Sequence, residues 1–302
     1  MPRTFSRRAL ICASAGLAFA PRAEASPNRL DFLVVGDWGD PHVNAQREVA
    51  TAMGEVASSI AGDFVISTGD NFYNRGVRSV RDPQWRATYE SVYSAPSLQA
   101  PWYVVLGNHD YAGDPEAEVA YTATSPRWRM PARYWREDMT LAGGEVATFF
   151  FLDTTPITRL SGVRDYIPGT TGGARPQLRW FEDQLAACTS RWRIVVGHHP
   201  ILSSGNHGPD HAVAEHVQPL LERYGVHAYI NGHDHDLEHL QERGVHYVCS
   251  GSGSEARGIN AVPQSRFAYA NTGFASCAIT GGQFQLRFHD SNTRVLYDTQ
   301  LS

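Results

Sequence analysis

The chain has 302 residues, of which 42% are hydrophobic and 19% charged, and its formal net charge is -5. This length suits one large α/β domain or two small ones, and the negative charge gives no reason to expect a nucleic-acid partner. All 26 basic residues are arginine, so the lysine required by a phosphate-binding P-loop or a pyridoxal-phosphate Schiff base is missing and both classes are excluded.

The first 25 residues have the composition of an export signal. The pair Arg7-Arg8 precedes an apolar, alanine-rich stretch over 9–20, and Ala23-Glu24-Ala25 forms an A-x-A cleavage pattern. Twin arginines before such a stretch are typical of twin-arginine export, although an ordinary secretory signal or a disordered basic tail stays open. Because spanning a bilayer takes roughly 20 apolar residues, we expect no membrane span. We predict a signal over 1–25 that export machinery recognises, a folded domain over 26–302, and a periplasmic or secreted location.

Five apolar runs in the rest of the chain each end in a polar loop that contains glycine. In chain order, the runs over 30–35, 63–68, 102–106, 192–196 and 227–230 precede GDWG, GDNFY, GNHD, GHHP and NGHDH. Near-continuous apolar runs of this length predict strands buried on both faces, as in largely parallel sheets. Ligands bind beyond the carboxyl ends of such strands, and glycine allows sharp turns there. We therefore expect the loop side chains to gather at one edge of a sheet.

Segments with helical spacing of apolar residues lie between these runs. They cover 43–60, 177–187 after Pro176, and 213–224, and their alternation with strands predicts an α/β fold. After His235 the pattern changes to short strands over 245–250, 274–279, 283–288 and 295–298, which we expect to complete the same domain, mostly in antiparallel order. The stretch over 156–173 is rich in Gly, Pro and Ser, and it predicts a surface loop.

The cysteines indicate neither a zinc site nor a disulfide framework. Cys12 lies in the predicted signal, and Cys188, Cys249 and Cys277 form no CxxC pair. Cys249 and Cys277 lie in apolar, strand-like runs, where buried free thiols are expected. A disulfide between these two stays open.

The polar loops together offer seven metal donors without a thiolate. These donors are Asp37, Asp70, Tyr73, Asn108, His198, His233 and His235. Oxygen and imidazole donors suit iron, zinc or manganese. Seven donors exceed what one ion takes from a protein while keeping an open position, so two ions that share a bridging carboxylate are expected. Two ions about 3.5–4 Å apart can bind a phosphoryl group between them.

The ordered series GDWG, GDNFY, GNHD, GHHP and GHDH resembles the motif series of the purple, or tartrate-resistant, acid phosphatases within the calcineurin-like metallophosphoesterases. The match runs from about Leu30 to Gly253. The resemblance implies a four-layer α/β/β/α sandwich of two mixed sheets, whereas the strand pattern alone indicates only α/β. It also implies that 26–302 form a single catalytic domain, which hydrolyses phosphate monoesters at acidic pH by attack of a metal-bound hydroxide.

The resemblance further implies which donors bind each metal. The first metal, a ferric ion, would be bound by Asp37, Asp70, Tyr73 and His235. Asp70 would bridge to a second ion, which is iron(II), zinc or manganese and whose other ligands would be Asn108, His198 and His233. Most of the superfamily places a histidine two residues after the first aspartate, where this chain has Gly39. The subfamily assignment therefore depends on Tyr73, whose phenolate favours ferric iron and gives such proteins their purple colour.

Three further residues are candidates for catalysis. His109 directly follows Asn108, so its side chain is expected to point toward the substrate, and the resemblance implies that it contacts the phosphoryl oxygens and helps to protonate the leaving alkoxide. Asp110 is expected to orient His109. His207 resembles a second histidine on the substrate side of the mammalian-type enzymes. His199 is expected beside the ligands without binding metal, and ordinary surface or helix positions are expected for His211, His216 and His239.

The substrate is expected to be a small phosphorylated molecule that the sequence does not name. The segments over 73–81, 111–136 and 154–173 are expected to frame the pocket, where Arg75, Arg78 or Arg133 could contact an anionic group. One alternative is a phosphodiesterase or nucleotide phosphatase on the same dinuclear centre, which Tyr73 argues against in most cases. Another is a metal-carrying binding or sensor protein, which the retention of His109 argues against. A purely structural exported protein would leave the seven donors unexplained.

Overall fold

The computed structural model describes residues 28–40, 44–160 and 173–301. The predicted signal over 1–25 lies outside these residues, as does most of the predicted surface loop over 156–173. Among the described residues, no helix combines the length and the apolar composition needed to cross a membrane.

Two seven-stranded mixed sheets form the centre of the fold. The first sheet has the order β14-β13-β12-β1-β2-β3-β4. Its strands are β1 (Arg29–Val35), β2 (Phe64–Ser67), β3 (Trp102–Val104), β4 (Trp128–Arg129), β12 (Gly273–Thr280), β13 (Phe284–Asp290) and β14 (Val295–Gln300). β1 to β4 run parallel to one another, and β12 to β14 extend the sheet in antiparallel order from β1.

The second sheet has the order β11-β9-β10-β8-β7-β6-β5. Its strands are β5 (Trp135–Thr140), β6 (Val146–Phe151), β7 (Trp192–Val196), β8 (Ala228–Asn231), β9 (Leu237–Glu242), β10 (Val245–Ser250) and β11 (Ser265–Tyr269). β6, β7, β8 and β10 are parallel, while β5, β9 and β11 are antiparallel to their neighbours. Both sheets are therefore mixed.

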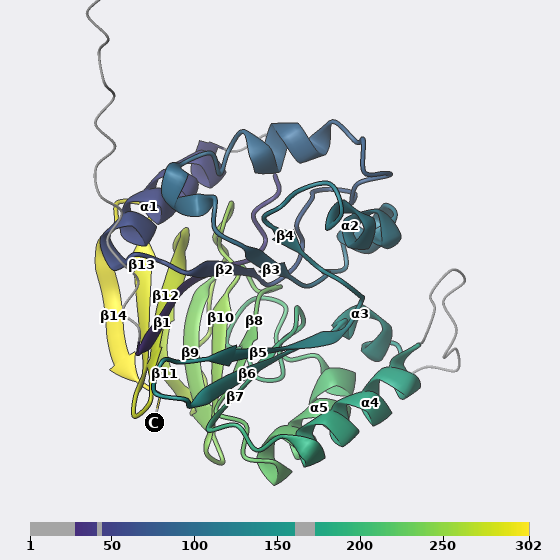
Figure 1. The fold of residues 1–302 in the computed structure, drawn as a ribbon, viewed down its shortest axis with the longest axis vertical. Helices are drawn as coiled ribbons and strands as arrows, with labels where there is room; N and C mark the ends of the chain where they lie inside the picture. Colours follow the sequence, from purple (N-terminus) through teal and green to yellow (C-terminus); the bar gives the residue numbers. More distant parts are fainter. Residues whose placement is uncertain (1–27, 41–43, 161–172, 302) are drawn as a thin grey trace, which may run out of the picture.

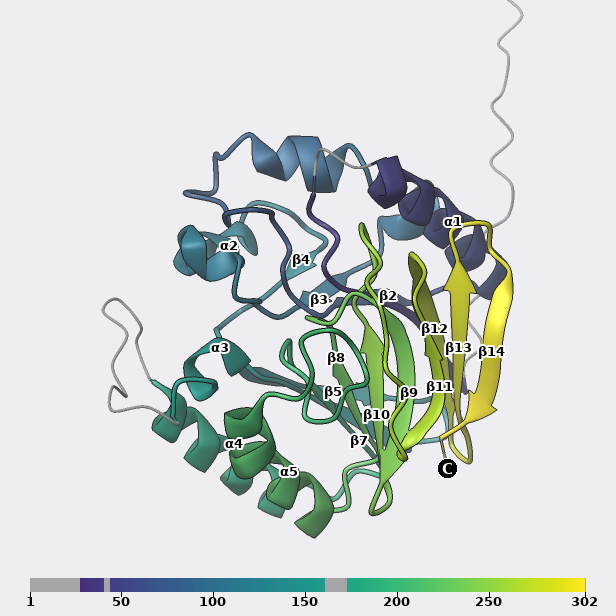
Figure 2. The ribbon, with the colours of Figure 1, turned by 180° about the vertical axis from the view of Figure 1, so that it is seen from behind.

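Helices cover the outer face of each sheet (Figures 1 and 2). On the side of the first sheet lie α1 (Asn44–Ile60), the π-helical turn η1 (Trp85–Glu90), the short 3-10 turns η2 (Pro96–Leu98) and η3 (Asp110–Ala112), and α2 (Pro115–Tyr121). On the side of the second sheet lie α3 (Thr154–Ile157), α4 (Ala174–Ala187) and α5 (His211–Arg223). The predicted four-layer α/β/β/α sandwich is confirmed.

The layers are held by apolar side chains that alternate along the strands. In β1, Phe32 points into the core between the two sheets, while Leu33 points into the core between the first sheet and α1. Phe32 stacks on Phe64 with ring centroids 4.8 Å apart, and Phe149 of β6 meets each ring edge-on at 5.7 Å. This aromatic contact fixes the two sheets face to face, so the loops at their carboxyl ends are held on one side of the molecule.

Several helices and strands of the structure differ from the predicted ones. β7 and β10 have the predicted bounds, and the other predicted strands differ by a few residues. β4, β5, β6, β9 and β11 were not predicted. The segment over 111–136, expected as a pocket loop, contains α2 and β4 and the start of β5, and α3 begins the stretch expected as a surface loop. In each case, pairing with a distant strand or packing against a helix stabilises a regular element that local composition does not indicate.

The structure also tests the predictions for the cysteines and for His239. Cys188, Cys249 and Cys277 are buried and free, so the disulfide left open between Cys249 and Cys277 is absent. The expectation that His239 is an ordinary surface or helix residue is wrong. It lies on β9, is 2% exposed and contacts His246 Nδ1 through Nε2 at 2.9 Å.

Candidate metal centre

The seven predicted donors lie together in the structure, but they come from both sheets. Asp37, Asp70, Tyr73 and Asn108 follow β1, β2 and β3 of the first sheet, and His198, His233 and His235 follow β7 and β8 of the second. The expectation of one edge of a single sheet is therefore corrected. The donors gather where the carboxyl ends of two packed sheets meet.

The backbone of these loops is bent to bring the donors inward. Asp37, Asp70 and His233 adopt positive φ angles of 56°, 49° and 71°, which non-glycine residues adopt at a cost and which cluster at functional sites. Gly107 allows close approach, because a Cβ there would lie 2.1 Å from Asp70 Oδ1. These loops therefore require glycine between strand and donor for steric reasons.

One donor cluster is centred on the Tyr73 hydroxyl. Tyr73 Oη lies 3.0 Å from Asp37 Oδ1, 3.1 Å from Asp70 Oδ2 and 3.1 Å from His235 Nε2. His235 Nε2 is itself 3.5 Å from Asp37 Oδ1. Three oxygen donors and one imidazole nitrogen thus face one another.

A second donor cluster is centred on His198. Its Nε2 atom lies 3.2 Å from Asn108 Oδ1 and 3.2 Å from His233 Nδ1. The same nitrogen is 3.5 Å from Asp70 Oδ2, the oxygen that also contacts Tyr73. Asp70 therefore belongs to both clusters.

These separations fit two metal ions. Bonds of roughly 2.0–2.2 Å from an ion to nitrogen and oxygen ligands place neighbouring ligand atoms about 3 Å apart. The contacts of 3.0–3.1 Å around Tyr73 Oη and 3.2 Å around His198 Nε2 have this spacing. Asp37, Asp70 and His198 also lie close enough to share one ion. The donor set is thus suited to a dinuclear centre bridged by Asp70.

The electrostatics of the clusters favour a cation. Burial raises the pKa of the Tyr73 phenol well above its usual range, and the Asp37 and Asp70 carboxylates raise it further. Burial alone would lower the pKa of His198, but the Asp70 carboxylate raises it to about 9. Burial and repulsion from His198 lower the pKa of His233 to about 2. A bound cation would offset the charge of the two carboxylates and favour the deprotonated forms of the phenol and the imidazoles.

His199 lies beside the second cluster. Together with His198 and His233 it forms a group whose nitrogens could reach one ion. Its Nδ1, however, lies 2.8 Å from Thr154 Oγ1, and burial, with repulsion from His198, lowers its pKa well below the usual range. His199 thus lies beside the candidate ligands with its Nδ1 in contact with Thr154, and the expectation that it binds no metal stays a prediction.

His109 lies at the open side of the first cluster. Its ring is 4.6 Å from the Tyr73 ring, centroid to centroid, and its side chain is 36% exposed. Its Nδ1 lies 3.0 Å from the Asn74 carbonyl oxygen, which only accepts hydrogen bonds, so Nδ1 carries a proton. Nε2 is then the atom that faces the cluster, 4.0 Å from Asp70 Oδ2.

The expectation that Asp110 orients the His109 ring is wrong. The buried Asp110 carboxylate accepts hydrogen bonds from the backbone N–H groups of Gly107, Asn71 and Phe72 at 2.8–3.1 Å. Burial raises its pKa to about 7, although these bonds oppose the shift. The carboxylate therefore joins the loop after β2 to the loop after β3, and the Asn74 carbonyl orients the His109 ring.

His207 lies at the side of the second cluster, with its ring centroid 4.6 Å from that of His233. Its backbone N–H donates to Asp234 Oδ1 at 2.7 Å. Sequence reasoning missed two neighbours, Glu255 and Arg257. Arg257 NH1 lies 2.8 Å from His207 Nε2, and Glu255 Oε2 lies 3.1 Å from His235 Nδ1. These two residues belong to no recognised motif, so no sequence signal pointed to them.

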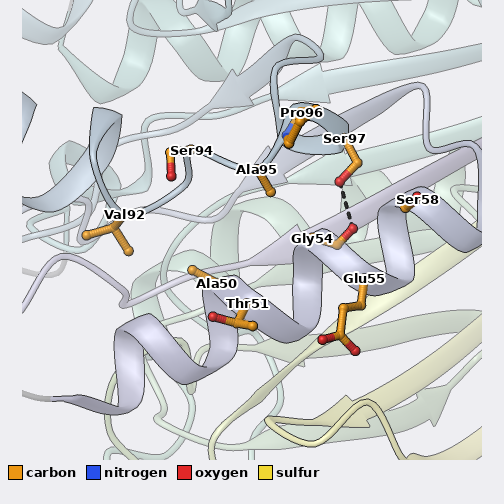
Figure 3. Close-up of a pocket in the computed structure, with 10 residues that line it drawn as sticks. All are labelled: Ala50, Thr51, Gly54, Glu55, Ser58, Val92, Ser94, Ala95, Pro96 and Ser97. Carbon is orange, nitrogen blue, oxygen red and sulfur yellow. Dashed lines mark hydrogen bonds between the residues drawn. The ribbon is translucent and has the colours of Figure 1, made fainter. Parts of the chain in front are cut away.

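The predicted arginines differ in their surroundings. Arg133 is 9% exposed, and it pairs with Glu116 at 2.8 Å and lies 3.7 Å from Asp153. The expectation that it contacts an anionic substrate is wrong because its charge is buried and paired. Arg75 and Arg78 are exposed. The hollow in Figure 3 lies elsewhere, between α1 and η2, where Ser97 Oγ donates to the Gly54 carbonyl at 2.6 Å.

Comparisons with known proteins identify relatives over almost the whole chain. The calcineurin-like phosphoesterase family matches residues 30–237. Tartrate-resistant acid phosphatase type 5 of Oryctolagus cuniculus is 37% identical over 305 residues, which cover 93% of each chain. Purple acid phosphatase 3 of Arabidopsis thaliana is 36% identical over 285 residues, which cover 89% of this chain and 76% of that protein.

Solved structures share the fold. GAP50, described as the anchor in the inner membrane complex of Plasmodium, aligns with a TM-score of 0.82 and 27% identity over 91% of this chain and 89% of its own. A purple acid phosphatase from yellow lupin, Lupinus luteus, aligns with a TM-score of 0.68 and 15% identity over 91% of this chain and 54% of its own. At that identity, the lupin structure supports the fold alone.

Proposed function

This chain belongs to the calcineurin-like phosphoesterase family, in its tartrate-resistant or purple acid phosphatase group, and on that premise we propose the role of each site residue. The chain is a dinuclear-metal acid phosphatase that acts on small phosphorylated substrates. The observation that carries the detailed proposal is the pair of donor clusters that share Asp70.

The first metal in this proposal is Fe(III). Its ligands are Asp37, Asp70, Tyr73 and His235. The second ion is Fe(II), zinc or manganese, and its ligands are Asp70, Asn108, His198 and His233. Two carboxylates and a phenol around one position support a hard, highly charged ion there, and the softer, imidazole-rich second set supports a divalent ion.

The protein's own groups act around the substrate that these metals bind. When bound, the two ions supply positive charge for the phosphoryl group and activate water. His109 presents Nε2 toward the cluster and donates a proton to the leaving alkoxide. His207 contacts the phosphoryl oxygens from the opposite cluster. Asp110 holds the two loops that carry Asp70 and Asn108 at a fixed separation.

The proposed biological setting follows from the amino terminus. Residues 1–25 are proposed to be a twin-arginine export signal, and 26–302 a single catalytic domain that works in the periplasm or outside the cell. The measurement is the size and location of the protein after Arg7→Lys with Arg8→Lys. The variant should accumulate unprocessed in the cytoplasm, and normal export and cleavage would contradict the proposal.

A test of the metal assignment combines the visible spectrum with metal analysis and phosphomonoester hydrolysis. The purified protein should be purple, contain iron and hydrolyse the ester. Tyr73→Phe should lose the visible band because the phenolate donor is gone, whereas Tyr269→Phe, at an exposed position on β11, should keep it. A colourless, iron-free protein with full activity would overturn the ferric assignment.

Measured rates of hydrolysis also distinguish the proposed acid phosphatase from the alternative functions. A relative described as an anchor shares the fold, so binding without turnover is the alternative from a different class. A phosphodiesterase or nucleotide phosphatase is the alternative within enzymes. A comparison of rates on a phosphate monoester, a diester and a nucleotide distinguishes them, and we expect the monoester to be hydrolysed fastest.

A further inference from the structure

Glu255 and Arg257 link the two sides of the metal centre. Glu255 Oε2 lies 3.1 Å from His235 Nδ1 and accepts a hydrogen bond from Arg257 NH2 at 2.9 Å. Arg257 NH1 lies 2.8 Å from His207 Nε2. A chain of contacts thus runs from a donor of the first cluster to the histidine beside the second cluster.

The segment that carries these residues is fixed to the site by its backbone. The Arg257 N–H donates to the His235 carbonyl at 2.8 Å. Ser254 Oγ donates to the Asp37 carbonyl at 2.6 Å, and the Asn260 N–H donates to the Ser204 carbonyl at 2.6 Å. These bonds fix the backbone of the segment, and the contacts to His207 and Glu255 hold the Arg257 guanidinium, which lowers the entropy that an interaction with it must overcome.

The guanidinium lies one side chain away from the metal donors. His207 separates it from His233, and Glu255 separates it from His235. A substrate group that reaches Arg257 therefore belongs to the part of the ester beyond the phosphoryl group. The Arg257 side chain is 34% exposed, so such a group can approach it from solvent.

The chemistry of this position favours a carboxylate. A guanidinium has five N–H donors, and the contacts to His207 and Glu255 involve only NH1 and NH2. Arg257 already binds one carboxylate, that of Glu255, which is 54% exposed. Arginine also pairs with carboxylates in a planar, directional geometry. A carboxylate on the substrate could join Arg257 or replace Glu255.

We propose that Arg257 is a specificity-determining residue that favours phosphomonoesters whose leaving alcohol carries a carboxylate. This inference rests on the proposed function of the centre. Glu255 opposes this preference, because its charge competes with the substrate for the same guanidinium.

The test compares 3-carboxyphenyl phosphate with its neutral 3-carbamoylphenyl analogue, which has the same shape. In the metal-loaded wild type, the ratio of kcat/KM for the carboxylate ester over the amide ester should fall roughly tenfold on Arg257→Gln, as expected when one charged contact is lost. The same ratio should rise on Glu255→Gln. Because both esters use the same centre, damage to His235 cancels from the ratio.

Opposite shifts in two neighbouring variants separate recognition from structural support, since a structural role would move both in the same direction. Arg243→Gln is the matched control, because Arg243 is exposed and pairs with Glu222 away from the site, and its ratio should equal that of the wild type. Inhibition by inorganic phosphate, which lacks a leaving group, should change little in Arg257→Gln.

Two outcomes would overturn the inference about Arg257 but leave the proposed function intact. One is an unchanged ratio in Arg257→Gln, and the other is a loss of phosphate inhibition as large as the change in ratio, which would place Arg257 on the phosphoryl group. If the metal-loaded wild type hydrolyses neither ester, the proposed function fails as well, so the two failures are distinguishable.

Discussion

Single residues give this site its chemistry through the atoms that they share. Asp70 Oδ2 contacts Tyr73 Oη at 3.1 Å and lies 3.5 Å from His198 Nε2, so one carboxylate joins both donor clusters. His109 and His207 lie against different clusters, with their rings 4.6 Å from those of Tyr73 and His233. Acid catalysis and phosphoryl binding can therefore be assigned to separate side chains and tested separately.

His109→Ala should lower kcat for a phosphate monoester by roughly 10²- to 10⁴-fold, the usual contribution of a positioned proton donor. Metal content and the visible spectrum should stay unchanged, because the ring is proposed to touch substrate and not metal. His216→Ala on α5 is the control and should retain wild-type activity. Equal kcat in His109→Ala and wild type would contradict the assigned role.

Asp110→Asn should destabilise the protein by about 1–3 kcal/mol, because an amide cannot accept all the backbone hydrogen bonds that the buried carboxylate accepts. The free energy of unfolding in urea measures this effect. Asp183→Asn, at an exposed position on α4, should change it little. If both variants have the same stability, Asp110 does not hold the two loops together.

At the scale of elements, β9 and β10 bury a pair of histidines away from the metal centre. His239 Nε2 lies 2.9 Å from His246 Nδ1, and His239 Nδ1 lies 3.1 Å from Tyr297 Oη of β14. Burial lowers the pKa of His239 to about 3 and that of His246 to about 4. The fold therefore keeps both imidazoles neutral in the range where they would be charged in the unfolded chain.

This burial predicts a loss of stability in acid. A histidine whose pKa is lower in the folded state makes its full contribution to stability above its ordinary pKa of about 6.5. In that range the imidazole is neutral in both the folded and the unfolded state. Its contribution is lost as pH falls from there toward about 4 and then about 3. The free energy of unfolding should therefore fall with a slope on the order of 1 kcal/mol per pH unit for each neutral histidine.

Urea unfolding at pH 6.5 and at pH 4.5 measures that slope. His239→Gln should reduce the slope relative to wild type, since one titrating group of the buried histidine pair is removed. His216→Gln, at a half-buried position on α5, should leave it unchanged. Parallel pH profiles for wild type and His239→Gln would show that the strand pair does not contribute to acid sensitivity.

At the scale of the whole molecule, the candidate metal donors come from both sheets. Asp37 and Asp70 follow strands of the first sheet, whereas His198 and His235 follow strands of the second. A metal ion bound by both sets would cross-link the sheets at their carboxyl edge. Away from that edge, the aromatic contact of Phe32, Phe64 and Phe149 holds the two sheets together by burying apolar surface.

Removal of the metals should therefore lower the thermal midpoint by several degrees. An ion present at roughly 100 to 1,000 times its dissociation constant stabilises a fold by about 3–4 kcal/mol. Thermal unfolding before and after chelation measures this, with the metal content determined in each sample. Re-addition of iron and zinc should restore the midpoint, and an unchanged midpoint in fully metal-free protein would show that the ions do not link the sheets.

The sequence by itself determined which residues are candidate metal donors, because each one lies in a short loop next to a strand and a glycine. Asp37, Tyr73 and His235 were identified from residue type and local spacing. Tertiary structure decided the relations between distant segments. His233 donates its backbone N–H to Asp37 Oδ2 across 196 positions, and the donors divide between two sheets, which strand pairing alone determines.

Side-chain direction was also decided only in three dimensions. Asp110 follows His109 in the chain, yet its carboxylate turns to three backbone amides, because burial requires partners for its charge. Arg257 and His207 lie 50 positions apart, and a hydrogen bond from the Asn260 N–H to the Ser204 carbonyl helps to join their loops. Local spacing thus identifies candidate ligands within one loop, whereas contacts that cross loops depend on the register of strands far apart in the chain.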